Sequence, residues 1–203
     1  MPSNSTGRGD FHAINNGLSV DDLVMEYMEK NNIPGMTLAI VQAPYITRVV
    51  GYGLADLEKK RLMSCPTVFP LGQMTNAYTA VAVMQLKEEG KLCLDEGIDV
   101  YLPNCPKHWQ GITVRQLLMH ASGIPDFNQL TQPEDIFQTM KDAKLLFKSG
   151  ENVQPSSSNF YLLGLIIESV SGMTYQEYVT KNQLERLGLK RTFFTSNLNT
   201  MVN

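Results

Sequence analysis

The sequence contains few of the residues that disulfide-rich and zinc-binding proteins depend on. Only three cysteines and three histidines occur in 203 residues. The cysteines form neither an even disulfide set nor a Cys-x-x-Cys pair, so we expect thiols that act as small apolar groups. The histidines lack the i, i+4 spacing of a helix-borne zinc site. These residues are Cys65, Cys93, Cys105, His12, His108 and His120. The sequence therefore predicts no metal site.

Long apolar and long basic segments are also missing. Residues 1–17 lack the apolar stretch of a signal peptide, and no later segment approaches the length of a membrane span. As written, the chain is expected to be cytoplasmic, with an exported origin left open if a signal was removed. The formal net charge is -3, and the absence of a basic run gives nucleic-acid binding no electrostatic support.

What is present is an ordinary globular composition, with 43% hydrophobic and 18% charged residues. The Ser-, Asn- and Gly-rich start predicts a flexible tail over residues 1–18, followed by one domain over residues 19–203. Ser19 is the predicted N-cap of a helix that runs to about Lys30, with Asp21 and Asp22 in its first turn.

Two strands are predicted next, over residues 36–41 and 46–52, paired antiparallel. Gly51 and Gly53 suggest a bend or a close backbone approach at the end of the second strand. Helical patterns fill nearly everything from residue 73 to about residue 190. Two strands alone make a marginal sheet, so another part of the chain, a second copy or a missing segment must cover them.

Several stretches match one protein family in its order and spacing. They are residues 33–41, 51–56, 69–72, 92–103, 112–126, 161–168 and 187–189. The most specific is residues 112–126, which contains the run from His120 to Asp126. Together they resemble the serine β-lactamase and penicillin-binding-protein-like hydrolases, which include class C β-lactamases, and the match covers about residues 19–194.

The resemblance implies an α+β fold of the β-lactamase/transpeptidase type. In this chain it would comprise a helical domain plus an incomplete antiparallel sheet of two N-terminal strands. The family places its active site in the cleft between a sheet domain and a helical domain. It uses neither a metal nor an organic cofactor.

The family's reaction is acyl transfer through a serine ester, with a lysine three residues after the serine. By resemblance, the serine position falls on Gln73 and the lysine position on Asn76, in Gln73-Met74-Thr75-Asn76. An amide side chain offers no hydroxyl to acylate, and Asn76 stays neutral and cannot act as a general base. Thr75 carries a hydroxyl, but it lies two residues along the helix from Gln73 and therefore points toward another helix face.

The family's Tyr-x-Asn motif falls on Pro155-Ser156-Ser157, so its tyrosine is absent as well. The hydroxyls of Ser156, Ser157 and Ser158 remain alternative nucleophiles, although no basic partner lies nearby in sequence. We favour a polar loop that precedes and caps a helix. His120 is expected to make a structural hydrogen bond, and Ser122 is expected to be a turn residue.

The family's third motif, Lys-Thr-Gly or a variant, does not appear after Leu187. Three hypotheses follow. The first is a non-catalytic relative that binds a small polar or peptide ligand through Gln73, Asn76 and the three serines, or pairs as a homodimer or with a partner strand through its exposed sheet edge. The second is an active hydrolase, esterase or acyltransferase with a non-standard nucleophile. The third is a truncated, degenerate family member.

Overall fold

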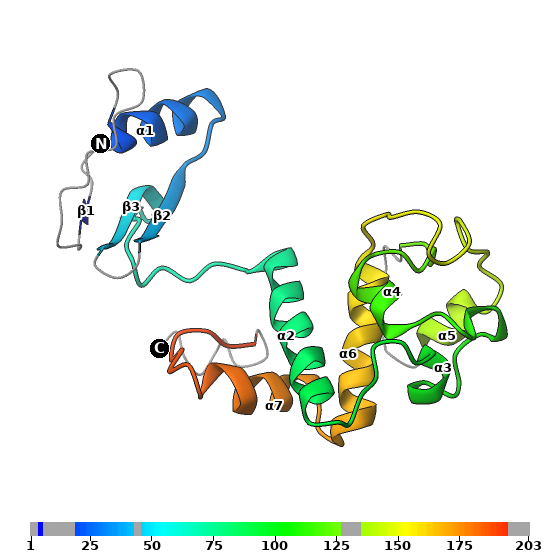
Figure 1. The fold of residues 1–203 in the computed structure, drawn as a ribbon. Helices are drawn as coiled ribbons and strands as arrows, with labels where there is room; N and C mark the ends of the chain where they lie inside the picture. Colours follow the sequence, from blue (N-terminus) through cyan, green and yellow to red (C-terminus); the bar gives the residue numbers. More distant parts are fainter. Residues whose placement is uncertain (1–3, 6–18, 43–45, 127–134, 195–203) are drawn as a thin grey trace. The chain divides into compact units, whose positions relative to one another are not determined.

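The computed structural model describes residues 4–5, 19–42, 46–126 and 135–194. The chain divides into two compact units, residues 1–70 and residues 71–203 (Figure 1). Apart from Asn4–Ser5, the predicted tail lies outside the described residues.

The first unit holds an antiparallel sheet and one helix. The two predicted strands are present as β2 (Gly35–Gln42) and β3 (Ile46–Asp56), with Ala39 opposite Val49. Two further strands, β1 (Asn4–Ser5) and β4 (Arg61–Leu62), also pair with β3, and the order along the sheet is β1-β3-β2. A two-residue strand is too short to show alternation, which explains why the sequence pattern did not indicate these two.

The glycines near the end of β3 meet neighbouring backbone at close range. A Cβ on Gly51 would lie 2.7 Å from the Met63 carbonyl oxygen. Gly53 has φ of +71°, and a Cβ there would lie 2.3 Å from the Pro34 carbonyl oxygen. Of the two predicted alternatives, a bend or a close backbone approach, the close approach is confirmed.

Helix α1 (Val20–Lys30) begins where the sequence predicts. The Ser19 hydroxyl accepts from the Asp22 amide, and the Asp22 carboxylate accepts from the Ser19 amide, which completes a capping box. Val24 and Met28 of this helix form one buried cluster with Val50 and Tyr52 of β3.

The second unit is helical. Its longer helices are α2 (Thr75–Glu88), entered through the 3₁₀ turn η1 (Gly72–Met74), and α6 (Ser157–Ser171). The shorter ones are α3 (Ile98–Tyr101), the 3₁₀ turn η2 (Lys107–Trp109), α4 (Val114–Leu118), α5 (Asp135–Met140), α7 (Tyr175–Val179) and the π-helical turn η3 (Thr180–Leu184). From α2 onward, these elements lie within the stretch from residue 73 to about residue 190 for which the sequence predicts helical structure.

Helix α6 is the centre of this unit and packs against α2, α3, α4 and α7 (Figure 1). The side chains of Leu162, Leu163, Ile166 and Ile167 are completely buried, as is Trp109 of η2. Burial of this many large apolar side chains supplies the main stabilising free energy of the unit. Among the described residues, no helix has both the length and the apolar character needed to cross a bilayer.

Candidate functional site

The start of α2 carries Gln73 and Asn76, where the sequence resemblance places the family's nucleophile and base. Gln73 lies exposed in η1, and Asn76 lies half-buried in the first turn of α2. Within the described part of the chain, neither side chain forms a hydrogen bond with another residue. The sequence holds no charged residue from Leu71 to Leu86. This helix start therefore presents neutral amides and no group that could remove a proton.

The three serines lie at the start of α6, where their environments differ. Ser156 is the N-cap residue and is buried, Ser157 is the first helical residue and is exposed, and Ser158 is buried. The predicted polar loop thus ends at Ser156, and the next two serines belong to the first turn. The Ser156 side chain makes no capping hydrogen bond of its own.

The cap of α6 comes instead from Asp126. Its Oδ1 accepts from the Ser157 amide at 2.9 Å and from the Ser158 amide at 3.3 Å. The hydroxyls of Ser156 and Ser158 lie 3.5 Å and 3.4 Å from the same oxygen. A carboxylate at the amino end of a helix satisfies amides that have no partner within the helix and favours the helix dipole.

His120 holds the residue just before the helix. Its Nδ1 lies 3.2 Å from the Ser156 amide nitrogen, which donates to it, and 3.2 Å from Asn159 Nδ2. The imidazole ring also lies 5.1 Å from the Phe160 ring, centre to centre. Burial lowers the pKa of His120, and the Asp126 carboxylate opposes that shift. The predicted structural hydrogen bond of His120 is present.

Ser122 belongs to the same hydrogen-bond network. It is completely buried, and its hydroxyl donates to Asn159 Oδ1 at 2.6 Å while accepting from the Ile124 amide at 3.0 Å. The second bond is a serine turn, as expected from the sequence. Asn159, itself buried, therefore joins the loop after α4 to α6 through both ends of its amide.

Ser156, His120 and Asp126 are the three residue types of a catalytic triad, but they are connected differently. A triad needs a serine hydroxyl that donates to histidine and a histidine that donates to the carboxylate. Here His120 Nδ1 accepts from a backbone amide, and the carboxylate accepts from helix amides. The Ser158 hydroxyl donates to the Pro125 carbonyl at 2.9 Å. This arrangement fixes a helix start and does not activate a hydroxyl.

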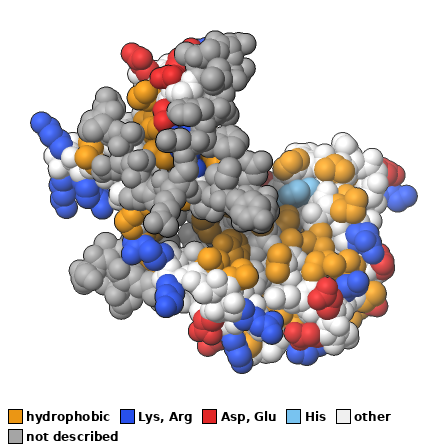
Figure 2. Space-filling model, turned by 60° about the vertical axis from the view of Figure 1, so that its left-hand side comes forward, with side chains coloured by type: hydrophobic (Ala, Val, Ile, Leu, Met, Phe, Trp, Pro, Cys, Tyr) orange, Lys and Arg blue, Asp and Glu red, His pale blue; other side chains and the backbone are white. Residues whose placement is uncertain are grey.

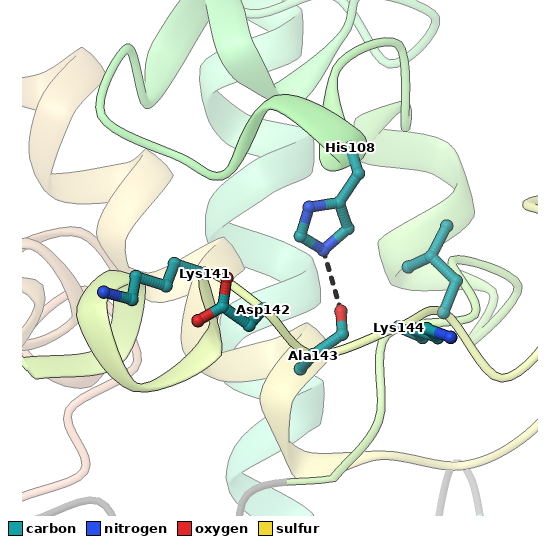
Figure 3. A pocket seen from close by; sticks show the side chains of 6 residues that line it. His108, Lys141, Asp142, Ala143 and Lys144 are labelled. Atoms are coloured by element: carbon teal, nitrogen blue, oxygen red, sulfur yellow. Dashed lines mark hydrogen bonds between the residues drawn. The ribbon is translucent and has the colours of Figure 1, made fainter.

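A shallow pocket of about 350 Å³ lies elsewhere on the helical unit, beside His108 (Figure 3). His108 Nε2 lies 2.8 Å from the Ala143 carbonyl oxygen. The amines of Lys141 and Lys144 point in opposite directions in Figure 3 and do not converge on one point. Among the described residues, no group of three or more His, Cys, Asp or Glu side chains is placed to hold a metal ion.

The surface in Figure 2 shows basic and acidic side chains interspersed with hydrophobic ones on the visible face. Neither basic nor acidic side chains dominate among the described residues on that face, in agreement with the small net charge.

Sequence reasoning named the amide pair of α2, the three serines of α6, His120 and Ser122, but missed the roles of Asp126 and Asn159. Asp126 closes the most family-specific stretch, residues 112–126, so its place at a loop end was visible. Its partners lie 31 and 32 positions further along the chain, and no local pattern connects them. Asn159 gave one signal: a side-chain amide within a helix needs hydrogen-bond partners if it is buried.

Comparisons with known proteins agree with this architecture. The family model described as Beta-lactamase matches residues 20–201. Protein flp of Staphylococcus aureus (strain MW2) is 31% identical over 86% of this chain, and penicillin-binding protein 4* of Bacillus subtilis (strain 168) is 28% identical over 81%. Each match covers 38% of the relative, so this chain spans well under half of their length.

Two solved structures are similar in fold. An octameric penicillin-binding protein homologue from Pyrococcus abyssi has a TM-score of 0.78 at 31% identity, and covers 88% of this chain and 45% of its own. A class C β-lactamase has a TM-score of 0.80 at 25% identity, over 89% of this chain and 52% of its own. With its α+β fold and a family match over most of its length, this chain belongs to the β-lactamase family.

Proposed function

We propose that this chain is a non-catalytic member of the β-lactamase family that acts by binding. The observation that carries the proposal is the pair of amide side chains at the start of α2, where Gln73 is exposed and Asn76 is half-buried. An acyl-enzyme needs a hydroxyl or thiol nucleophile and a group that takes its proton, and Gln73 and Asn76 supply neither. The neighbouring Thr75 carries a hydroxyl, but the sequence places no charged residue beside it from Leu71 to Leu86.

The serines of α6 do not replace the missing pair. The Ser158 hydroxyl donates to a backbone carbonyl, and the Ser156 hydroxyl lies against the carboxylate that caps the helix. Ser157 is exposed, but the nearest titratable partners, Asp126 and His120, are engaged with backbone amides. These contacts support a structural role for this segment.

The ligand class that fits is a small polar molecule or an extended peptide. Unengaged amide groups offer both a donor and an acceptor, which match the peptide bond and neutral polar groups. Because neither residue carries a charge, binding through them should depend little on ionic strength.

The test is reversible binding of a D-alanyl-D-alanine peptide and of benzylpenicillin, measured by ligand-observed NMR. We expect weak binding that Gln73→Ala and Asn76→Ala each reduce at least a few-fold, and no consumption of either compound. Gln110→Ala, at another exposed glutamine, is the matched control. Binding that survives both variants, or turnover of either compound, would contradict the proposal.

The partner we propose for the first unit is a second copy of the chain. Strand β2 pairs with β3 along one edge, and its other edge has no partner strand among the described residues. An open strand edge is a template for pairing with another chain. The Pyrococcus abyssi homologue is described as octameric, which supports self-association. Light scattering behind size exclusion would test this, and a strict monomer at micromolar concentration would refute it.

A further inference from the structure

The contacts of His120 define a latch at the amino end of α6, outside the amide pair of α2. The ring stands on the loop after α4, and its Nδ1 receives the Ser156 amide and Asn159 Nδ2, each at 3.2 Å. We propose that this is an acid-released latch: protonation of His120 frees the loop over residues 120–126 from the start of α6.

The bonding fixes the protonation state of the ring at neutral pH. A backbone N–H can only donate, so the Nδ1 that faces the Ser156 amide has to be an acceptor. The side chain of Asn159 agrees, because its Oδ1 already accepts from Ser122 and its Nδ2 therefore faces His120. The neutral ring must carry its proton on Nε2.

Adding a proton to Nδ1 would place a donor against two donors. The backbone amide of Ser156 cannot become an acceptor. The side-chain amide of Asn159 can flip only by breaking its 2.6 Å bond with Ser122. Both partners would then be left without an acceptor at a largely buried position, where an unmade hydrogen bond is costly. Protonation of His120 therefore strongly disfavours the latched geometry.

Burial and the nearby carboxylate shift the pKa of His120 in opposite directions. Burial disfavours the imidazolium and holds the pKa of His120 below its ordinary value of 6.5. The Asp126 carboxylate, on the same loop, favours the imidazolium but less strongly. The side chains that contact the ring from α6, Asn159 and Phe160, carry no charge. The folded state therefore prefers the neutral ring.

The direction of the pH effect follows from linkage. Because the pKa of His120 is lower in the latched state than in the open one, the latch is at full strength above about pH 6.5. It weakens as the pH falls below that value, by up to about tenfold in the closed-to-open ratio for each pH unit, until the ring titrates in the latched state as well. Opening would expose the hydroxyls of Ser156 and Ser158, which are buried in the closed form.

Asn is the matched replacement for His120. Its Oδ1 occupies nearly the position of the imidazole Nδ1, accepts the same amide and does not titrate. His120 has φ of +55°, a left-handed conformation that Asn tolerates better than most residues. His108→Asn is the control, because that ring lies against Ala143 and outside the network.

The experiment is hydrogen exchange on the full chain at pH 7.5 and pH 5.0, with rates corrected for intrinsic exchange. We expect protection at residues 156–160 to fall by at least a few-fold on acidification in the wild type and in His108→Asn, and much less in His120→Asn. An equal fall in His120→Asn would overturn the proposal. Should that variant not fold, the nitrogen shifts of the wild-type ring decide, since a ring protonated on Nδ1 at pH 7.5 would also overturn it.

Discussion

At the scale of single residues, Ser122 shows how strongly this site depends on buried polar contacts. Its hydroxyl is completely buried and serves the Ile124 amide and Asn159 Oδ1. We expect Ser122→Ala to lower the free energy of unfolding by about 1–3 kcal/mol, because both partners lose a bond and cannot reach water. Urea denaturation measures this difference. Ser157→Ala, at an exposed serine of the same network region, should cost under about 0.5 kcal/mol. Equal losses in the two variants would contradict the assignment.

The Asp126 cap gives a second residue-scale prediction. Asp126→Ala removes the acceptor of the Ser157 and Ser158 amides, and we expect a loss of about 0.5–2 kcal/mol in unfolding free energy. Asp142→Ala, at an exposed aspartate beside the His108 pocket, is the control. A loss no larger than the control's would show that another group satisfies these amides.

At the scale of elements, α2 has a buried face and an exposed apolar face. Leu86 is completely buried against the core of the helical unit, whereas Val81 is 48% exposed. Leu86→Ala should lower the free energy of unfolding by about 2–5 kcal/mol through lost burial and a cavity. Val81→Ala should cost far less. Thermal or urea unfolding followed by circular dichroism compares them, and a comparable cost at Val81 would mean that its face is covered in solution.

Helix α1 is joined to β3 by a polar contact that predicts an alkaline transition. The Tyr52 hydroxyl lies 2.5 Å from Asp21 Oδ1, and burial together with that carboxylate raises the pKa of Tyr52 to about 12. The folded state therefore favours the protonated phenol. Its contribution to stability is complete below about pH 10 and is lost as the pH rises from about 10 to about 12.

Ultraviolet titration near 295 nm tests this expectation. We expect Tyr52→Phe to remove one late-titrating phenol and to flatten the loss of stability above pH 10. Tyr27→Phe, at an exposed tyrosine of α1 outside this contact, is the matched control. A titration curve whose late part is unchanged in Tyr52→Phe would show that the Asp21 contact does not form.

Elements were predictable where local signals coincide. The boundaries of α1 follow from the Ser19 cap and its acidic first turn, and β2 and β3 follow from two short apolar runs separated by a turn. The placement of Gln73 and Asn76 at the family's serine and lysine positions was predicted from the family resemblance alone. The network of His120, Asp126 and Asn159 was not, because its hydrogen bonds join residues 31 to 39 positions apart. Only tertiary packing of the loop after α4 on α6 brings them together.

At the scale of the whole molecule, the chain has two compact units and matches part of larger family members. It covers 38% of protein flp and 45–52% of the two similar solved structures. The family fold is present in this chain, and we propose that it persists without the residue types that acyl transfer requires.

The proposal is that an amide pair replaces the family's serine and lysine in this chain. Intact-mass spectrometry tests it directly, because it detects any covalent acyl adduct. The whole chain would be incubated with benzylpenicillin and with a fluorophosphonate, beside a penicillin-binding protein as positive control. We expect an unchanged mass for the wild type. We also expect no robust turnover for the Gln73→Ser, Asn76→Lys double variant, since Pro155 stands where the family has its tyrosine. A covalent adduct on the wild-type chain, mapped to the start of α2 or to Ser156, Ser157 or Ser158, would contradict it.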